Sequence, residues 1–236
     1  MKDEAKQRGI NECIDGSLIK GMDENMYVIS DTHFGHSNMI GYSPARFETA
    51  RSLLCREPTK DDHQVIDELL VTRWNATVKG DDTILHLGDL TLYSRSVPAL
   101  TKRLNGRKVL LRGNHDDKGA AFYEALGWRV VAKPRVSRKS TCIVATIDGI
   151  KVFFSHIPAF QNPGAPDEAT TDFSAEDLGL LFNAEKCDVN VHGHIHDRVP
   201  LDSRCVNVSA EAINFTPIRI GSLIDRWRAE RIEKIG

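Results

Sequence analysis

Aspartate, asparagine and histidine recur along this chain in short polar stretches whose side chains could bind metal ions. The stretches are DTH, GD, GNHD, a single histidine and GHIH, and their candidate ligands are Asp31, His33, Asp89, Asn114, His156, His194 and His196. These side chains offer oxygen and nitrogen atoms without a thiolate, a set that suits Mn, Fe, Zn or Ni. Because one divalent ion takes about four protein ligands, the set is large enough for two ions that share a carboxylate.

Each stretch taken alone also has a structural interpretation. Gly88-Asp89 is a common turn dipeptide, and a single histidine such as His156 is more often a hydrogen-bonded structural residue. GHIH is a stronger signal, because alternate strand residues face the same side and His194 and His196 can point together. The combination favours a metal site, since every stretch follows an apolar run. Two neighbouring ions can hold the attacking and leaving oxygens of a phosphoryl group.

Short apolar runs rich in β-branched residues predict the strands that must position these side chains. The runs are Met26–Ser30, Thr83–Leu87, Lys108–Arg112, Trp128–Lys133, Thr141–Ile147, Ile150–Ser155, Val189–His192 and Cys205–Ser209. In open α/β sheets ligands bind beyond the carboxyl ends of the strands, so we expect the polar stretches to meet at one rim. Gly88, Gly113 and Gly193 would let the backbone turn sharply and approach the ions.

Helical patterns lie between several of the predicted strands. The clearest begins at Thr59, where Thr59 and Asp62 can form a capping box. The others are expected at Ser96–Leu104, Lys118–Leu126, Ser174–Ala184 and around Leu223–Ile232. The alternation of strand and helix, with a hairpin signal at Asp148-Gly149, favours an α/β fold with a mixed sheet or two packed sheets.

The length of 236 residues fits one large domain. We expect this domain over residues 25–236, preceded by an N-terminal extension over residues 1–24 that is flexible or lightly docked. Two stretches show no regular pattern, Ile40–Pro58 and Ile157–Phe173. Each is either a wall of the site or a decorated surface loop.

Composition and charge narrow the class of protein. The chain is 41% apolar and 27% charged with a formal net charge of -2, which gives no support for bulk attraction to nucleic acid or membranes. No apolar run approaches the ~20 residues that a membrane-spanning helix needs. The five cysteines form no C-x-x-C pair, so we interpret them as reduced, mostly buried thiols of a cytoplasmic protein.

The whole set of polar stretches resembles the calcineurin-like metallophosphoesterases. The residues that carry the resemblance are Asp31-x-His33, Gly88-Asp89, Gly113-Asn114-His115-Asp116, His156 and Gly193-His194-x-His196. SDTHFGHSN and LGD look most like the small bacterial and phage branch of this family. The resemblance implies a four-layer α-β-β-α sandwich with two mixed β-sheets.

The resemblance also implies a role for each polar residue. One ion would bind Asp31, His33, Asp89 and His196, and a second would bind Asp89, Asn114, His156 and His194. A hydroxide bridging the ions would attack phosphorus, and His115 would face the substrate and protonate the leaving group. Asp116 would orient His115 or a ligand, or else act as an acid at a helix start. Mn is the ion that we expect to support activity in vitro.

Candidate substrate-binding residues lie beside the predicted ligands. His36 and Asn38 follow DTH, and Arg112 precedes GNHD. His36 either contacts the substrate or shapes its loop, and Arg112 either meets phosphate or serves packing. The family pattern often reads G-D-x-x-D, whereas Leu92 stands at the second acidic position here. GNHD also replaces the GNHE of the protein phosphatases, and both departures weigh against a phosphoprotein phosphatase.

The leading hypothesis is a phosphodiesterase that acts on a small nucleotide-like phosphoester, such as a cyclic nucleotide. The substrate class comes from the resemblance and from the lack of an obvious macromolecular platform. The alternatives are a nuclease of the same superfamily, a phosphomonoesterase, and a scaffold that has lost its chemistry. The net charge disfavours the nuclease, and the intact ligand set with His115 disfavours the scaffold.

Overall fold

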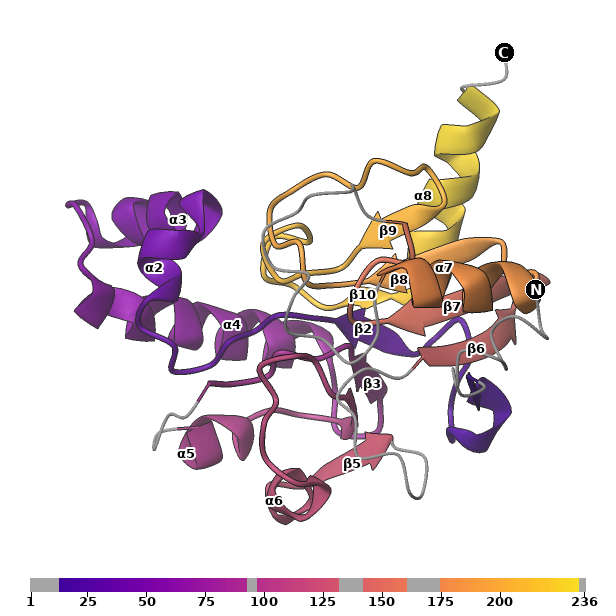
Figure 1. The fold of residues 1–236 in the computed structure, drawn as a ribbon. Helices are drawn as coiled ribbons and strands as arrows, with labels where there is room; N and C mark the ends of the chain where they lie inside the picture. Colours follow the sequence, from indigo (N-terminus) through magenta and orange to yellow (C-terminus); the bar gives the residue numbers. More distant parts are fainter. Residues whose placement is uncertain (1–12, 93–96, 132–141, 161–174, 234–236) are drawn as a thin grey trace.

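Two five-stranded sheets form the centre of the molecule (Figure 1). The computed structural model of the chain describes residues 13–92, 97–131, 142–160 and 175–233. The first sheet has the strand order β10-β2-β3-β4-β5. Its strands are β2 (Tyr27–Ile29), β3 (Thr83–His86), β4 (Arg107–Leu111), β5 (Trp128–Val131) and β10 (Ile218–Arg219). All neighbours are parallel except β10, which pairs antiparallel with β2.

The second sheet has the strand order β1-β6-β7-β8-β9. Its strands are β1 (Ile14–Asp15), β6 (Cys142–Ile147), β7 (Ile150–Ser155), β8 (Val189–His192) and β9 (Cys205–Asn207). Strands β6 and β7 form an antiparallel hairpin, and the other neighbours are parallel. Asp148 and Gly149 have φ angles of 48° and 74°, the left-handed backbone that Asp-Gly adopts in a tight hairpin turn. The predicted hairpin is therefore confirmed.

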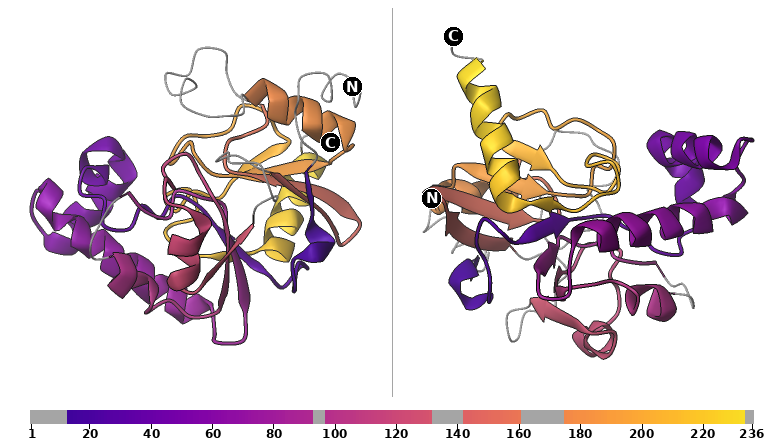
Figure 2. Two further views of the ribbon diagram at one scale, coloured as in Figure 1. Left: turned by 60° about the horizontal axis from the view of Figure 1, so that its bottom comes forward. Right: turned by 180° about the vertical axis from the view of Figure 1, so that it is seen from behind.

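Three hydrophobic clusters hold the layers together. The cluster between the sheets joins side chains such as Val28 and Leu85 to Phe154 and Val191. The other clusters pack α4 (His63–Thr77), α5 (Val97–Thr101) and α6 (Ala120–Ala125) on the outer face of the first sheet, and α7 (Ala175–Ala184) on the second. Figures 1 and 2 show these helices on opposite sides of the sheets. The predicted α-β-β-α sandwich with two mixed sheets is confirmed.

The helix predicted to begin at Thr59 is present. A turn of 3-10 helix, η2 (Lys60–Asp62), leads into α4, and Thr59 and Asp62 form the predicted capping box. Ile66, Leu70 and Trp74 are buried on one face of α4, which packs on the first sheet. The Trp74 indole donates a hydrogen bond to the Asn105 carbonyl at 3.0 Å, so its polar edge is satisfied where the ring is buried.

The other predicted elements are also present, with small shifts at their ends. The strand predicted at Lys108–Arg112 is Arg107–Leu111, and the helix predicted at Lys118–Leu126 is Ala120–Ala125. The last helix, α8 (Ile220–Glu233), packs Leu223, Ile224 and Trp227 into the inter-sheet cluster. Parts of the predictions at Ser96, Lys133, Thr141, Ser174 and 161–173 fall outside the described residues.

The stretch Ile40–Pro58 is largely helical, which corrects the expectation of irregular structure. It contains the end of α2 (Met39–Tyr42) and all of α3 (Pro44–Leu54). Ser43 caps α3, because its hydroxyl accepts a hydrogen bond from the Arg46 amide at 3.2 Å, and Pro44 occupies the first turn. The sequence Ser-Pro was thus a helix-start signal. We call Met39–Leu54 the α2–α3 lobe; it stands out from the sandwich beside the N-terminal end of α4 (Figure 1).

The N-terminal segment joins the second sheet through β1, which pairs with β6. Cys13 and Cys142 form a disulfide, so the expectation that all cysteines are reduced is wrong for this pair. They are 129 residues apart in sequence, and only the pairing of β1 with β6 brings their Cα atoms within 5.0 Å. The expected free thiols remain at Cys187 and Cys205, which are buried, and at Cys55, which is exposed.

No helix within the described residues is long and apolar enough to cross a membrane.

The N-terminal segment should contribute to stability through Ile19, which is 3% exposed in the inter-sheet cluster. We predict that Ile19→Ala lowers the free energy of unfolding by about 2–5 kcal/mol, because it removes buried methyl groups and leaves a cavity. The neighbouring Leu18 is 68% exposed, so Leu18→Ala should change it by less than about 0.5 kcal/mol. Urea denaturation of both variants tests this; equal effects would contradict it.

Candidate metal centre

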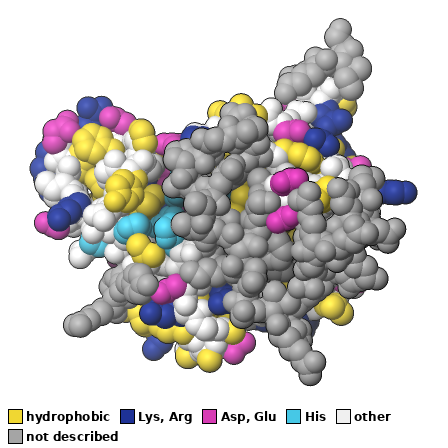
Figure 3. All heavy atoms as spheres, viewed as in Figure 1, with side chains coloured by type: hydrophobic (Ala, Val, Ile, Leu, Met, Phe, Trp, Pro, Cys, Tyr) yellow, Lys and Arg dark blue, Asp and Glu magenta, His cyan; other side chains and the backbone are white. Residues whose placement is uncertain are grey.

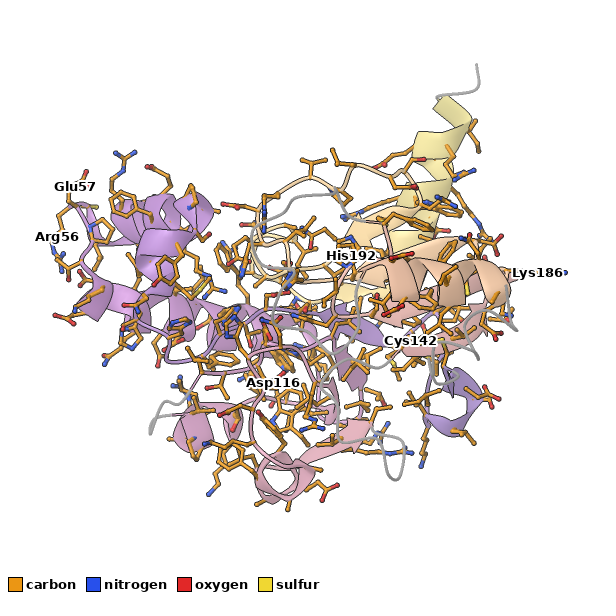
Figure 4. The ribbon with its side chains drawn as sticks, viewed as in Figure 1. Arg56, Glu57, Asp116, Cys142, Lys186 and His192 are labelled. Carbon is orange, nitrogen blue, oxygen red and sulfur yellow. A yellow bond between two sulfur atoms is a disulfide. The ribbon has the colours of Figure 1, made fainter. Side chains whose placement is uncertain are left out.

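The polar stretches meet at the carboxyl ends of strands from both sheets. Strands β2, β3 and β4 lead to Asp31, Asp89 and Asn114, and strands β7 and β8 lead to His156 and His194. Asp116, after β4, and His192, at the end of β8, mark this region near the middle of the molecule (Figure 4). The structure therefore brings the sequence-predicted rim together from two sheets.

The ligand atoms lie close enough to share ions. Asp31, His33 and His196 offer atoms within 4.8 Å of one another, and so do Asp31, Asp89 and His156. Asp89 Oδ2 lies 3.5 Å from His33 Nε2 and 3.3 Å from His156 Nε2, between the two groups. Asp89 therefore lies within reach of candidate ligands on both sides of the cluster.

Several of these atoms are buried without a protein partner. Among the described residues, Asp31 Oδ1 and both ring nitrogens of His33 are buried and make no hydrogen bond. Leaving such groups unsatisfied costs about 1–3 kcal/mol each. Native proteins keep such unsatisfied atoms rare, so these need an explanation. Divalent cations satisfy carboxylate and imidazole atoms together, so the residues present fit metal ions.

Asn114, His156 and His194 form the other side of the centre. Asn114 Oδ1 lies 2.8 Å from His156 Nε2 and 3.1 Å from His194 Nδ1. His156 Nδ1 lies 2.9 Å from the Leu87 carbonyl and must donate to it, which leaves Nε2 facing Asn114 and Asp89. A hydrogen bond on the far nitrogen fixes the tautomer and the ring orientation of a metal-binding histidine.

The electrostatics of the cluster favour bound positive charge. Burial alone lowers the pKa of His156, but the Asp89 carboxylate outweighs it and raises that pKa to about 9. Burial lowers the pKa of His33 well below its usual value and that of His194 to about 3, so both rings are neutral, the form that binds metal. Asp89 keeps its charge, because His156 holds its pKa low against the effect of burial.

Strained backbone positions the ligands. Asp31, His33, Asp89, His194 and His196 all have positive φ angles, between 46° and 71°. This left-handed conformation is uncommon for residues with side chains and costs of order 1–3 kcal/mol in sparsely populated regions. Its concentration at the predicted ligands indicates that surrounding contacts impose it, and it clusters in this way at functional sites.

Two glycines allow the strand ends to approach each other. A Cβ atom on Gly113 would lie 2.2 Å from Asp89 Oδ1, and one on Gly193 would lie 2.2 Å from Asp31 Oδ2. Carbon and oxygen atoms do not approach this closely without a bond, so neither position has room for a side chain. Both glycines thus bring the backbone against carboxylates of proposed ligands; the predicted approach to the ions stays a prediction.

The Asp116 side chain holds the backbone of the loops that carry proposed ligands. Its carboxylate accepts hydrogen bonds from the backbone amides of Asp89 at 2.7 Å, Leu90 at 3.1 Å and Gly113 at 2.8 Å. Burial and the charge of Asp89 raise its pKa to about 7. Asp116 is fully buried and holds the proposed ligand Asp89 through its backbone amide. These contacts favour the predicted role in which Asp116 orients a ligand, and that role stays a prediction.

His115 and His36 lie beside the centre, whereas Arg112 and Asn38 have other contacts or exposure. The His115 side chain is 42% exposed, with Nε2 4.0 Å from Asp89 Oδ2. The His36 ring centroid is 5.6 Å from that of His33, and its Nδ1 is buried without a partner. Arg112 donates to the Lys118 carbonyl at 3.0 Å, which favours the packing role. Asn38 is exposed and precedes α2 without a side-chain capping bond.

Sequence reasoning missed two residues that touch the ligands. Glu211 is buried, and its Oε1 lies 3.2 Å from His196 Nδ1. Ser209 Oγ donates to Asp31 Oδ2 at 3.1 Å. Both follow β9, so the rule applied to the other strand ends would have found them. Arg46 lies inside the protein against Glu211.

Comparisons with known proteins identify the family of the chain. The model of the calcineurin-like phosphoesterase superfamily domain matches residues 25–216. An uncharacterised protein of Methanocaldococcus jannaschii is 28% identical over 209 residues, covering 84% of this chain and 89% of that protein. The crystal structure of a protein of unknown function from Aquifex aeolicus has a TM-score of 0.59 at 25% identity, covering 82% of this chain and 94% of that one.

A two-sheet sandwich with a buried Asp-His-Asn cluster at its strand ends defines a hydrolase of phosphoesters. The family match spans most of the sequence, so the chain belongs to the calcineurin-like phosphoesterase superfamily. Members of this superfamily generally use divalent metal ions, in agreement with the ligand groups found here.

The close approach at Gly113 gives a test of the centre that does not depend on activity. We predict that Gly113→Ala abolishes high-affinity metal binding, because the new methyl group would displace Asp89. Gly119→Ala is the matched control, since nothing lies within 4 Å of its Cβ position and its φ is -64°. Metal content after dialysis, measured by mass spectrometry, should be lost only in the first variant. Full metal content in Gly113→Ala would contradict the assigned geometry.

Proposed function

We propose that this phosphoester hydrolase is a phosphodiesterase for small nucleotide-like substrates, such as cyclic nucleotides, with two divalent ions at its centre. The observation that carries the hydrolytic site is the set of buried, unpartnered atoms of Asp31 and His33 facing Asp89. We propose Mn, Fe, Zn or Ni as the ions, with Mn supporting activity in vitro. We also propose a cytoplasmic location, which now rests on the free thiols of Cys55, Cys187 and Cys205 alone, because Cys13 and Cys142 form a disulfide.

The proposed ligand sets follow the two sides of the centre. Asp31, His33, Asp89 and His196 would hold one ion, and Asp89, Asn114, His156 and His194 would hold the other. When bound, the ions would supply Lewis-acid stabilisation of the phosphoryl oxygens and an acidified water. The protein holds the donors in position before substrate arrives, because strained backbone and buried hydrogen bonds fix their directions.

His115 is the proposed acid for the leaving group. Its backbone amide donates to Asp89 Oδ1 at 2.9 Å, which ties the residue to the centre, while its side chain is 42% exposed. An imidazolium there would hold a proton on Nε2 or Nδ1 and transfer it to the leaving alkoxide oxygen as the P–O bond breaks. Because the side chain is partly exposed, a substrate could reach it from solvent.

An exposed aromatic ring beside the centre supports the nucleotide preference. Tyr42 is 70% exposed, and its ring centroid lies 6.3 Å from that of His36, which in turn lies 5.6 Å from that of His33. Histidine and hydrophobic side chains lie side by side on this edge of the α2–α3 lobe (Figure 3). Bases stack on exposed aromatic rings with about 1–3 kcal/mol per base, so Tyr42 could hold a base while the phosphate reaches the centre.

We predict that His115→Ala retains metal content but loses turnover, most severely for substrates with poor leaving groups, which need the proton. Removing a general acid typically costs about 10²–10⁴-fold. Steady-state rates on a series of aryl and alkyl phosphodiesters, with metal analysis of each preparation, check this. The role assigned to His115 fails if the loss is equal for all leaving groups or if metal content falls as in Asp89→Ala.

We predict that Tyr42→Ala raises KM for 2′,3′- and 3′,5′-cyclic nucleotides about 5–100-fold, because the base loses its stacking surface. Hydrolysis of ribose 2′,3′-cyclic phosphate, which has no base, should be unchanged and serves as the matched control. Equal effects on both substrates would rule out the stacking role.

A substrate panel separates the proposal from its alternatives. It would compare monoesters, linear diesters, cyclic nucleotides, DNA and RNA with the metal-loaded protein. Turnover of nucleic acids but not of small diesters would identify a nuclease, and preference for monoesters would identify a phosphomonoesterase. The absence of metal-dependent turnover, or turnover that Asp89→Ala leaves unchanged, would indicate a scaffold.

A further inference from the structure

The α2–α3 lobe reaches the metal centre through one buried side chain. Arg46 lies in the first turn of α3, and its side chain is 3% exposed. Its guanidinium donates to the Asp31 carbonyl at 2.7 Å and to the Thr32 carbonyl at 3.1 Å. These carbonyls belong to the strained segment that carries Asp31 and His33. One lobe residue therefore fixes the backbone of two proposed ligands.

The same guanidinium holds a carboxylate that orients a third ligand. Arg46 Nε donates to Glu211 Oε1 at 2.5 Å, and that oxygen lies 3.2 Å from His196 Nδ1. The Glu211 side chain has no exposed surface, so solvent does not compete for this oxygen. Arg46 and His196 therefore meet at one buried carboxylate oxygen. With Nδ1 donating to Glu211, His196 keeps Nε2 free for an ion.

A second contact ties the lobe to the same side of the centre. The amide of Ala45 in α3 donates to Asp197 Oδ2 at 3.2 Å, and Asp197 follows His196 directly. The proposed ligands on the opposite side of the centre are held by residues outside the lobe. His156 is held by the Leu87 carbonyl, and the amide of Gly113, directly before Asn114, is held by Asp116. In the described part of the chain, the contacts of Arg46 and Glu211 thus lie on one side of the centre, that of Asp31 and His196.

We propose that Arg46 and Glu211 are positioning residues that assemble one of the two metal positions, that of Asp31, His33 and His196. The α2–α3 lobe is then a structural part of this position, and displacement of α3 would release one ion while the other stays bound. This inference rests on the proposed dinuclear centre. It adds that the binding of one ion depends on the α2–α3 lobe more than the binding of the other does.

Metal binding by Arg46→Ala tests the inference without relying on turnover. We expect one Mn²⁺ to bind as in the original protein and the other to bind about 10–100-fold more weakly, the usual effect of removing a partner of a ligand. Titration calorimetry gives both affinities, and electron paramagnetic resonance distinguishes a coupled Mn²⁺ pair from a single ion. At intermediate Mn²⁺ the coupled signal should be replaced by that of the isolated ion.

Three further variants separate positioning from general stability. Arg51→Ala is the matched control, because Arg51 lies on the same helix with a half-exposed side chain paired to Glu48. It should bind two ions as the original protein does. Glu211→Gln keeps the side-chain volume, removes the charge and should weaken the same ion, even if Arg46→Ala proves too unstable to purify. Arg46→Lys keeps the charge but loses the forked donors, and should bind that ion with intermediate affinity.

The outcomes distinguish failure of this inference from failure of the proposed function. Two ions bound with unchanged affinity in Arg46→Ala and Glu211→Gln would overturn the inference and leave the phosphodiesterase proposal intact. Equal weakening of both ions would also overturn it, because the pair would then support the whole centre. An original protein that binds no second ion would overturn the dinuclear centre and this inference together.

Discussion

The buried carboxylate of Asp31 is the point on which the site depends. Its Oδ2 accepts hydrogen bonds from the His194 amide and the Ser209 hydroxyl, which belong to segments that follow strands of the second sheet. Its own amide donates to the Gly88 carbonyl, after a strand of the first sheet. Its carbonyl accepts from Arg46 of the lobe. Both sheets and the lobe therefore meet at one residue, and Oδ1 is left for an ion.

This arrangement can persist only because the surrounding protein determines it. Asp31 has a φ of 57°, and four other proposed ligands share its left-handed backbone. Such a conformation is unfavourable alone, as is a buried carboxylate oxygen without a partner. The inter-sheet core and the hydrogen bonds of Asp116 hold the loops in place, and bound cations would satisfy the remaining atoms. The free energy gained by packing the core thus offsets the cost of the strained backbone at the site.

The α2–α3 lobe gives the centre its asymmetry. Its buried Arg46 contacts the segment that carries proposed metal ligands, while its exposed Tyr42 lies beside His36. One short helical segment could therefore influence both metal position and substrate choice. The segment has little apolar periodicity, and the buried Arg46–Glu211 pair anchors it to the sandwich together with the few apolar side chains that it buries, such as Ile40 and Ala50.

The sequence alone was sufficient for the fold class and for the candidate ligands. Strand periodicity and turn residues are local properties, and parallel strands deliver their carboxyl ends to one edge, so the polar stretches could be placed together. The Asp148-Gly149 hairpin and the Thr59 cap could likewise be predicted, because each depends on a few adjacent residues. Polar motifs at strand ends also carried the family resemblance.

Tertiary structure decided the contacts between residues far apart in the chain. The pairing of β1 with β6 created the Cys13–Cys142 disulfide, and the placement of α3 joined Arg46 to Glu211 across 165 residues. Asp116 is buried because the loop after β4 places its carboxylate against the backbone amides of Asp89 and Gly113. Sequence patterns report local backbone preference and burial, whereas these roles depend on which surfaces meet when the two sheets and the lobe pack.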